Sequence, residues 1–440
     1  MPPIPQTPLR HRTVILPIRM ILALMIPPLT LPIRTIPKTP MSDIRANRST
    51  EPVLGGPGAL KSTSAPLSQL YKLALLDLDG VVYRGKDPVE HAAEGIRNAE
   101  RLGMKISYTT NNPSRYPHTV AEQLEGFGLT VADNQVITSA IVAARMLAVA
   151  LPQGSKVLVV GREHLCEEIE KNGLRVVHKA ADKPDAVIQS WHQDLSWAEL
   201  AEASYAIHAG ARYFVTNKDL TIPREGGIAP GNGAMQIPVT VATGVTPEAS
   251  AGKPEAAMYD ESRMLFSLTD DLVPVDLSLP CGDRLDTDIE AANRGGYDSL
   301  VVLTGVATPQ QIICADPIHR PTYVTTDLRG LNMPQPAVTR RADGTYQCNA
   351  AVATLTMRGD GTGELTVAID GVDTPAPDAL DALRAACTCM WHAVDVEGVD
   401  ASRVSLPDFP QQLRGCDTAA GDTAAGDTAV GDVTDGDSVK

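Results

Sequence analysis

The sequence lacks an excess of basic residues. Its 440 residues hold 53 Asp and Glu against 38 Lys and Arg, which gives a formal net charge of −15. Because an acidic surface repels phosphate backbones, this composition disfavours a general nucleic-acid-binding role. A small anionic substrate is not excluded, since a binding site can be locally positive or can hold a cation.

A long uninterrupted hydrophobic run is also missing. The most apolar stretch, Ile15–Ile33, contains Arg19 and four prolines, whereas a membrane-spanning helix needs about 20 nearly continuous apolar residues. The arginines before it suit a signal peptide, but no clear small-residue cleavage site follows. We therefore expect no membrane partner, and we assign residues 1–68 to a disordered extension. Met41 begins an ordinary polar start, so residues 1–40 need not be translated.

Cysteine is scarce and has no pairing pattern. Seven cysteines, an odd number, argue against a disulfide scaffold. Cys387 and Cys389 are separated by one residue, not by the two of a C-x-x-C redox or zinc motif. The predicted location is therefore the reducing cytoplasm.

Short apolar runs alternate with helical patterns between residues 73 and 303. The first run, Leu73–Leu76, is unbroken, as expected of a strand covered on both faces of a parallel sheet. Asp87 and Pro88 then predict a helix start. Further strands are predicted at Met104–Thr110, Val157–Val160, Ala186–Ile188, Tyr213–Thr216 and Leu300–Leu303. This alternation indicates an α/β fold, in which ligands bind at the carboxyl ends of strands.

The first predicted strand ends in Asp77-Leu78-Asp79-Gly80. Side-chain alternation places Asp77 and Asp79 on one side of the strand's tip. A plain acidic turn explains this motif equally well when it stands alone. A calcium EF-hand is excluded, because its glycine stands at the sixth position of a loop that follows a helix.

Three later segments offer polar groups near strand ends. Thr109–Pro113 follows the second strand and carries hydroxyl and amide donors suited to phosphate oxygens. Gly252-Lys253-Pro254 is not a Walker A loop, because the Ser or Thr and the upstream glycine are absent. Asp283 precedes Thr287 and Glu290, whose spacing predicts a capped helix start. Taken singly, these segments suit a turn, a solvated cation and an acidic loop.

In this order, D-x-D-G, T-N-N, G-K-P and G-D-x-x-x-T-D resemble the four motifs of the haloacid dehalogenase (HAD) superfamily of phosphatases. The stretch 73–331 resembles subfamily IIA, the branch of NagD, 4-nitrophenyl phosphatase and phosphoglycolate phosphatase. The further matching segments are Leu76–Arg84, Phe214–Pro223, Gly227–Ala234 and Thr325–Leu331. The resemblance implies a doubly wound, Rossmann-like core with a large inserted α/β cap, and a phosphatase acting on a small phosphorylated metabolite with Mg²⁺.

The resemblance also implies which residues carry the chemistry. Asp77 attacks phosphorus and forms an aspartyl-phosphate, which divides one difficult hydrolysis into two easier steps. Asp79 acts as general acid and then as general base. Mg²⁺, a hard cation that prefers oxygen ligands, is held by Asp77, Asp283 and the backbone carbonyl of Asp79.

Other residues are implied to bind the phosphoryl group or to support the site. Thr110, the backbone of Asn111 and the side chain of Lys253 contact phosphoryl oxygens and stabilise the transition state. Asp288 orients the metal shell or Lys253 without binding the metal directly. Asp286 is expected to be a solvated loop residue.

The spacing of the motifs places the cap. About 140 residues separate Thr110 from Lys253, far more than one crossover helix needs. We therefore predict a second α/β domain at 154–246, between core parts at 69–153 and 247–332.

Two cap features bear on the substrate. Asn217 and Asp219 lie in a family cap motif and are candidates to face the core, although packing or turn roles are equally open. Trp191 and His192 depart from the family pattern of small apolar residues and glycine. Packing is the favoured role for Trp191, and His192 is not expected to be a ligand.

The strand that leads to Asp283 is unusual, because it contains Pro280. Proline cannot donate a ladder hydrogen bond, so a central strand should be weakened or end early there. The placement of Asp283 depends on this point.

The C-terminal part lies outside the resemblance. Tyr346–Met357 and Glu364–Ile369 flank a Gly-rich turn and predict a hairpin, which a helix at Ala379–Trp391 follows. We predict a small hairpin-plus-helix appendage at 333–400 that packs on the core, with a partner-binding module as the alternative. Residues 401–440 contain Gly-Asp-Thr-Ala-Ala repeats and are predicted to be a disordered acidic tail.

The leading prediction is therefore a cytoplasmic, Mg²⁺-dependent phosphomonoesterase. The alternative is a non-catalytic phosphate-ligand-binding or interaction scaffold on the same fold. Sugar phosphates, phosphoglycolate, nucleotides and pyridoxal phosphate remain open as substrates, and a homodimer is compatible with the sequence.

Overall fold

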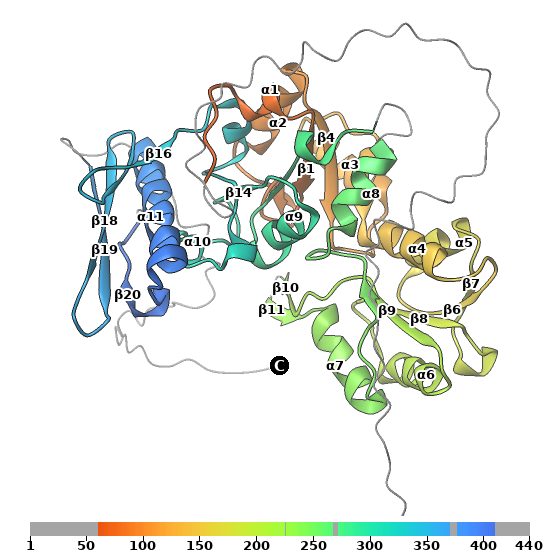
Figure 1. Cartoon of the computed structure of the whole chain (residues 1–440). Helices are drawn as coiled ribbons and strands as arrows, with labels where there is room; N and C mark the ends of the chain where they lie inside the picture. Colours follow the sequence, from red (N-terminus) through yellow and green to blue (C-terminus); the bar gives the residue numbers. More distant parts are fainter. Residues whose placement is uncertain (1–59, 225, 267–271, 370–375, 410–440) are drawn as a thin grey trace, which may run out of the picture. The chain divides into compact units, whose positions relative to one another are not determined.

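The computed structural model describes residues 60–224, 226–266, 272–369 and 376–409. Its largest sheet has six parallel strands in the order β15-β14-β13-β1-β4-β5 (Figure 1). The strands are β1 (Leu73–Asp77), β4 (Lys105–Thr110), β5 (Val136–Thr138), β13 (Ser278–Gly282), β14 (Leu300–Val302) and β15 (Tyr323–Thr325). The predicted α/β class with a parallel sheet is confirmed.

The central strand β1 is buried on both faces. Ala74 and Leu76 join one apolar cluster, whereas Leu73 and Leu75 join another. Successive strand residues point to opposite faces, so an unbroken apolar run is what this position in the sheet requires. The helical segments of the core are α2 (Ala92–Arg101), α3 (Pro117–Gly126), α4 (Ser139–Ala150), α8 (Ala257–Phe266), a π-helical turn (Leu285–Ile289), α9 (Glu290–Gly295) and α10 (Pro309–Ile313).

Two predicted helix starts are wrong. Asp87 and Pro88 form a hairpin strand instead, and α2 begins further along the chain. The hairpin strands are β2 (Tyr83–Arg84) and β3 (Asp87–Pro88). Thr287 does not cap α9, because it lies inside the π-helical turn that leads directly into α9.

The proline in β13 does not end that strand. Pro280 lies opposite Leu75 of β1, and the pairing with β14 begins one residue later, where Cys281 lies opposite Leu300. No hydrogen bond to β14 is therefore required at position 280. The expectation of an early end is wrong, and β13 continues to the residue before Asp283.

A separate five-stranded sheet occupies the segment where the spacing predicts a cap. Its order is β12-β9-β8-β6-β7, and all its pairs are parallel. Its strands are β6 (Lys156–Val160), β7 (Arg175–Val177), β8 (Ala186–Gln189), β9 (Arg212–Val215) and β12 (Ala249–Ser250). The segment also contains α5 (Glu163–Lys171), α6 (Trp197–His208), the hairpin β10 (Thr221–Arg224) and β11 (Gly227–Pro230), and α7 (Asn232–Thr243). The cap sheet thus extends past the predicted boundary at residue 246.

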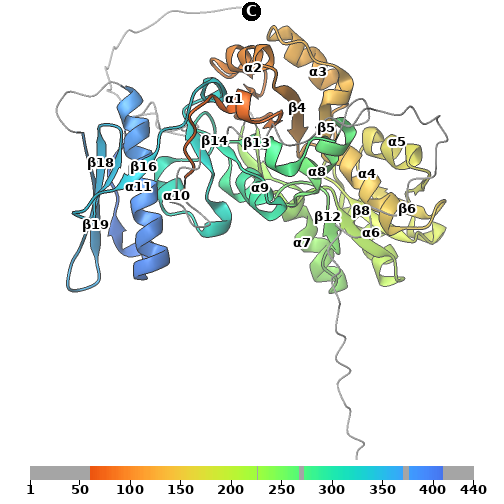
Figure 2. The ribbon, with the colours of Figure 1, turned by 45° about the horizontal axis from the view of Figure 1, so that its top comes forward.

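The C-terminal part contains a third sheet rather than a single hairpin. Its order is β16-β17-β18-β19-β20, and α11 lies beside β18 and β19 (Figures 1 and 2). The elements are β16 (Val338–Arg340), β17 (Tyr346–Cys348), β18 (Ala351–Met357), β19 (Gly363–Ile369), α11 (Ala376–Glu397) and β20 (Val404–Ser405). Leu383 and Trp391 of α11 share an apolar cluster with Val324 of β15, so the appendage packs on the core.

At both ends, described residues with defined structure lie beyond the predicted domain boundaries. Lys61 donates its backbone N–H to the Thr322 carbonyl at 3.1 Å, and Leu67 in α1 (Leu67–Leu70) is fully buried. Near the other end, β20 pairs with β19, and Phe409 is buried. The first residues of the expected tail and the last residues of the expected extension are therefore structured, because apolar side chains there reach the core.

The other predictions for the termini, including the signal-peptide alternative and the acidic repeats, fall on residues 1–59 and 410–440 and lie outside the described residues. Within the part of the chain that the structure describes, every helix is too short or too polar to cross a bilayer.

Candidate active site

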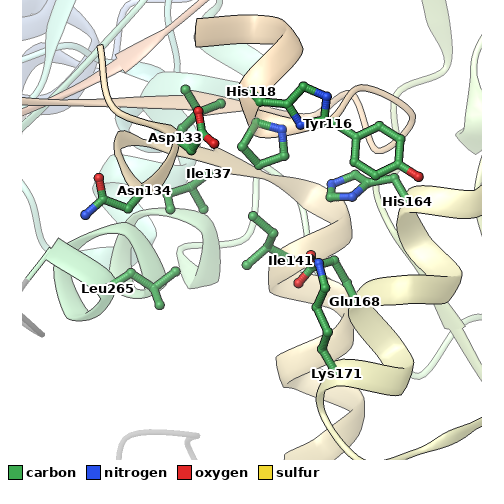
Figure 3. A pocket seen from close by; sticks show the side chains of 12 residues that line it. Tyr116, His118, Asp133, Asn134, Ile137, Ile141, His164, Glu168, Lys171 and Leu265 are labelled. Atoms are coloured by element: carbon green, nitrogen blue, oxygen red, sulfur yellow. Dashed lines mark hydrogen bonds and ion pairs between the residues drawn. The ribbon is translucent and has the colours of Figure 1, made fainter.

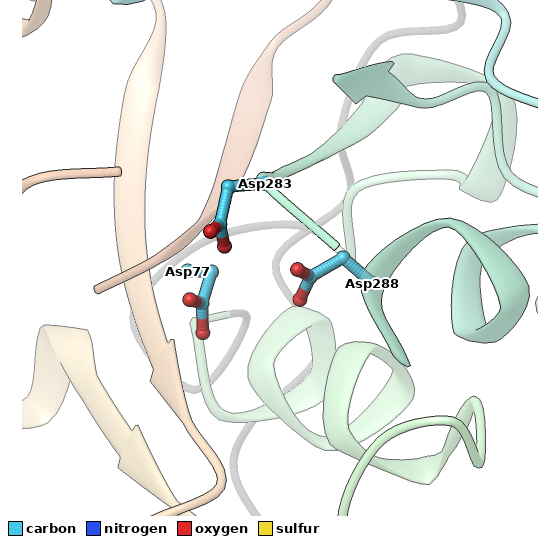
Figure 4. A group of neighbouring side chains, drawn as sticks. All are labelled: Asp77, Asp283 and Asp288. Atoms are coloured by element: carbon cyan, nitrogen blue, oxygen red, sulfur yellow. The ribbon is translucent and has the colours of Figure 1, made fainter. Parts of the chain in front are cut away.

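Three carboxylates meet at the carboxyl edge of the main sheet. Asp77 is the last residue of β1, Asp283 follows β13, and Asp288 lies in the π-helical turn before α9. Each offers an oxygen within 4.8 Å of the others, and Figure 4 shows the three side chains directed toward one another. Because β1 and β13 are parallel neighbours, their ends bring the two predicted metal ligands Asp77 and Asp283 together.

The ammonium group of Lys253 lies among these carboxylates. Its side chain is 2 % exposed, and its Nζ donates to Asp288 Oδ1 at 2.6 Å and also to Asp77 Oδ1. Burial alone would lower the pKa of Lys253, but the carboxylates of Asp288 and Asp77 outweigh it and raise that pKa. Lys253 is therefore held as a cation, in the place that the motif order predicted.

Two of these carboxylates, Asp77 and Asp283, resist ionisation. Burial raises the pKa of Asp77 well above its usual range against the opposing effect of Lys253, and Asp288 and Asp283 raise it further. Burial, followed by the charge of Asp288, raises the pKa of Asp283 to about 7. One ammonium does not balance three carboxylates that lie this close together, so the site calls for a further positive charge.

An unpartnered oxygen indicates where that charge fits. Asp283 Oδ2 accepts the Val306 N–H at 2.7 Å, whereas Oδ1 is buried and has no hydrogen-bond partner. A buried carboxylate oxygen without a donor is costly. The set of Asp77, Asp283 and Asp288 oxygens has the hard, anionic character that Mg²⁺ or Ca²⁺ prefers, so the residues fit the predicted cation.

Two glycines leave the room that Asp283 occupies. A Cβ on Gly305 would lie 1.8 Å from Asp283 Oδ2, and one on Gly80 would lie 2.4 Å from the same atom. Gly80 also has a φ of +82°, a conformation that glycine adopts without strain. The D-x-D-G turn and the loop after β14 therefore need glycine for close approach to the acid.

The predicted phosphate-binding residues lie beside this group. Thr110 is the last residue of β4, next to β1, and its Oγ1 accepts the Asn112 N–H at 3.1 Å. The side chain of Asn111 contacts the backbone of Lys253 twice, by accepting the N–H at 2.8 Å and donating to the carbonyl at 3.0 Å. The structure thus brings Thr110, Asn111 and Lys253 together.

Asp79 is placed differently from the expectation. β1 ends at Asp77, so strand alternation does not determine the direction of the Asp79 side chain. Asp79 lies in the following loop, is exposed, and bridges to Tyr83. It is not part of the three-carboxylate group, and its predicted role in acid–base catalysis and metal binding stays a prediction.

Both cap candidates reach the core at Asn111. The Asn217 amide donates to the Asn111 carbonyl at 2.9 Å, and the Asp219 carboxylate accepts the Asn111 amide at 3.1 and 3.2 Å. Their predicted direction toward the core therefore agrees with the contacts. His192 is buried and its Nε2 lies 2.9 Å from Glu199 Oε1 in α6, which is a packing position within the cap.

Comparison with known proteins places this site in a family. A family model described as haloacid dehalogenase-like hydrolase matches residues 74–175, and a HAD-hydrolase-like model matches residues 250–331. A D-glycerol 3-phosphate phosphatase of Mycobacterium tuberculosis is 37 % identical over 327 residues, which cover 74 % of this chain and 88 % of the relative. The chain belongs to the haloacid dehalogenase-like hydrolases.

Other members of the HAD family are also similar to this chain. The 5'-nucleotidase YutF of Bacillus subtilis is 34 % identical over 258 residues, which cover 59 % of this chain and 96 % of that protein. The crystal structure of a glycerol phosphate phosphatase from Mycobacterium tuberculosis in complex with magnesium matches with a TM-score of 0.65 and 35 % identity. That match covers 78 % of this chain and 96 % of the other. The resemblance to subfamily IIA is thereby confirmed.

Three partners of the HAD site are not evident from the motifs. Tyr259 in α8 is fully buried, and its hydroxyl lies 3.5 Å from Asp288 Oδ1. Val306 holds Asp283 through a backbone N–H, which no side-chain pattern reveals. Arg284 forms two hydrogen bonds with the Asp286 carboxylate, at 2.8 and 3.1 Å. Asp286 is therefore paired, although its side chain is exposed as expected.

One pocket lies away from these residues. It has a volume of about 510 Å³ and is lined by α3, β5, α4 and α5, with Tyr116, His118 and His164 grouped at one side (Figure 3). None of the predicted site residues lines it. This pocket is therefore separate from the carboxylate group around Lys253.

Proposed function

We propose that this chain hydrolyses a small-molecule phosphate monoester through an aspartyl-phosphate on Asp77, with Mg²⁺ as cofactor. The observation that carries the proposal is the convergence of Asp77, Asp283 and Asp288 on the buried ammonium of Lys253. The reaction class is that of the family: the chain is a hydrolase acting on phosphate esters.

The nucleophile in this mechanism is Asp77. Its carboxylate at the tip of β1 attacks phosphorus, forms a P–O bond and releases the alcohol of the ester. Asp79, two residues further in the exposed loop, gives a proton to the leaving oxygen. It then takes a proton from the water that hydrolyses the aspartyl-phosphate, which returns Asp77 and frees inorganic phosphate.

The remaining residues neutralise and position the phosphoryl group. Lys253 supplies a fixed positive charge within reach of Asp77, and Thr110 offers a hydroxyl at the adjacent strand end. Asp77 and Asp283 would hold Mg²⁺, and Asp288 would support both the metal and Lys253. A bound Mg²⁺ supplies the positive charge that lets a carboxylate approach a phosphate dianion.

Relatives define the first compounds to test. The names of the matched proteins include D-glycerol 3-phosphate phosphatase, 5'-nucleotidase and acid sugar phosphatase. The 327-residue match to the first is longer than the stretch from residue 73 to residue 331, so it also draws on parts of this chain outside core and cap. Glycerol 3-phosphate is therefore the first candidate substrate.

Phosphate release tests the proposal directly. Purified full-length protein is assayed with glycerol 3-phosphate, nucleoside 5'-monophosphates and sugar phosphates, with Mg²⁺ and with a chelator in excess. We expect Mg²⁺-dependent release from at least one class and its loss in chelator. Release that is equal in both conditions, or no release from any compound, would contradict the proposal.

Pro280 and the appendage are the two features behind the scaffold alternative. Pro280 no longer supports it, since β13 continues past this residue to the one before Asp283, whereas the appendage remains compatible with it. We also propose a reducing compartment, because the six cysteines in the described residues are free. The predicted homodimer and the absence of a nucleic-acid partner stay predictions.

A further inference from the structure

The side chain of Asn111 is shared between the catalytic lysine and the cap. Its Oδ1 accepts the Lys253 N–H at 2.8 Å, and its Nδ2 donates to the Lys253 carbonyl at 3.0 Å. Both backbone hydrogen-bonding groups of Lys253 are therefore satisfied by one amide. The family resemblance implies only that the backbone of Asn111 contacts phosphoryl oxygens.

The same amide nitrogen is also held from the cap. Asn111 Nδ2 lies 3.1 and 3.2 Å from the two carboxylate oxygens of Asp219, in the loop between β9 and β10. The backbone carbonyl of Asn111 accepts from Asn217 Nδ2 at 2.9 Å and from Ser139 Oγ at 2.7 Å. Two cap side chains, Asn217 and Asp219, thus form hydrogen bonds with one core residue.

Close packing leaves this junction little freedom. The Gly252 N–H donates to the Thr216 carbonyl at 2.8 Å, so the segment that carries Lys253 runs against the cap loop. A Cβ at Gly252 would lie 2.6 Å from Asn111 Oδ1 and 2.9 Å from Asn217 Cβ. A shift of the cap loop would therefore move Asn111 or the Lys253 segment.

The charge of Asp219 suits a positioning role. Its carboxylate is half-buried, and the Asn111 amide donates to both of its oxygens. A neutral amide between a carboxylate and a peptide carbonyl can satisfy both only in one orientation. That orientation fixes the Lys253 backbone, and with it the starting point of the ammonium.

We propose that Asp219 and Asn111 form a positioning pair that couples the cap loop to Lys253. When the cap loop is in place, Asp219 orients the Asn111 amide, and the amide sets Lys253 for the phosphoryl group. This inference deepens the proposed function and rests on it. Asp219 and Asn111 act through Lys253, so they are positioning residues rather than catalytic ones.

A donor–acceptor exchange tests the pair. Asn111→Asp keeps the shape and the acceptor for the Lys253 N–H, but it removes the donor and places a second carboxylate against Asp219. Asp219→Asn in the same chain restores one donor and one acceptor across the contact. We expect Asn111→Asp to lower kcat about 100-fold, and the double variant to recover about tenfold of that loss. Asn134→Asp, the same change at an exposed position, should leave kcat unchanged.

Phosphate affinity gives a readout that does not need turnover. The dissociation constant of inorganic phosphate, measured with Mg²⁺ by calorimetry, should rise about tenfold in Asn111→Asp and return toward the parent value in the double variant. The proposed coupling of Asp219 and Asn111 would be overturned if the two substitutions had additive effects on phosphate affinity. It would also be overturned if all variants bound phosphate with affinities within twofold of one another. If the parent protein binds phosphate but hydrolyses no ester, the proposed function fails while the coupling is still decided by the affinities.

Discussion

At the residue scale, the site has more acidic oxygens than it has hydrogen-bond donors and cations to partner them. Asp283 has one oxygen held by the Val306 N–H and the other buried without a partner, a state that favours a bound cation. The order of the four motifs and its resemblance to the HAD family predicted Asp77, Asp283 and Lys253, and parallel strand ends place Asp77 and Asp283 at one edge of the sheet. They could not predict Tyr259 or Val306, since both reach the site through tertiary packing.

His164 provides a residue-scale prediction of pH dependence. It is buried, its Nε2 lies 3.1 Å from Thr138 Oγ1, and burial lowers its pKa from the usual 6.5. The unfolded chain takes up a proton at this position as the pH falls below about 6.5, while the folded protein does not. Stability contributed by neutral His164 is therefore present at higher pH and is lost as the pH falls. We expect the drop in unfolding temperature between pH 7.5 and pH 5.5 to be smaller in His164→Gln than in the parent. An equal or larger drop would contradict this account.

At the element scale, several strands were predictable and two helix starts were not. Unbroken apolar runs identified β1, β6, β8 and β14 because strands buried on both faces need them. The helix starts at Asp87 and Thr287 were misplaced, since Asp87 pairs in a hairpin and Thr287 lies within a π-helical turn. Pro280 was tolerated because pairing with β14 starts one residue later.

The loop after β14 carries Gly305, whose backbone lies close to the Asp283 carboxylate. A Cβ on Gly305 would lie 1.8 Å from Asp283 Oδ2, so Gly305→Ala must displace the acid. We expect kcat to fall at least about tenfold, because a metal-binding carboxylate moved by a few tenths of an ångström loses its geometry. Gly359→Ala, with nothing within 4 Å of the added atom, is the matched control. Activity in Gly305→Ala equal to that control would contradict the role of the loop.

At the scale of the whole molecule, spacing predicted three parts but not their limits. The long interval between Thr110 and Lys253 correctly indicated a separate sheet, because a single crossover cannot use so many residues. The appendage lies outside the stretch that carries the four motifs, so pattern alone missed its five-stranded sheet. Burial of Leu67 and Phe409 extends the folded part at both ends, which local composition could not reveal.

Arg384 forms a buried ion pair within α11 and also donates to the backbone of the core strand β15, and it carries a prediction. Arg384 of α11 donates to Asp381 at 2.7 Å, to the Val324 carbonyl at 2.8 Å and to Gln335 at 3.0 Å. Arg384→Leu leaves Asp381 without its cation, so the free energy of unfolding should fall by about 3 kcal/mol. Arg358→Leu, at an exposed pair, should change it by about 0.5 kcal/mol or less. Denaturant titration measures both, and equal values would show that the buried contacts of Arg384 do not stabilise the fold.

The central claim is that Asp77 is the nucleophile of a phosphate-ester hydrolase. The most direct measurement compares turnover of p-nitrophenyl phosphate by the parent and by Asp77→Asn, with Mg²⁺ present and with folding monitored by thermal unfolding. Since an amide cannot form the aspartyl-phosphate, the account predicts that Asp77→Asn folds like the parent and has no detectable turnover. A folded Asp77→Asn protein with undiminished turnover would contradict it.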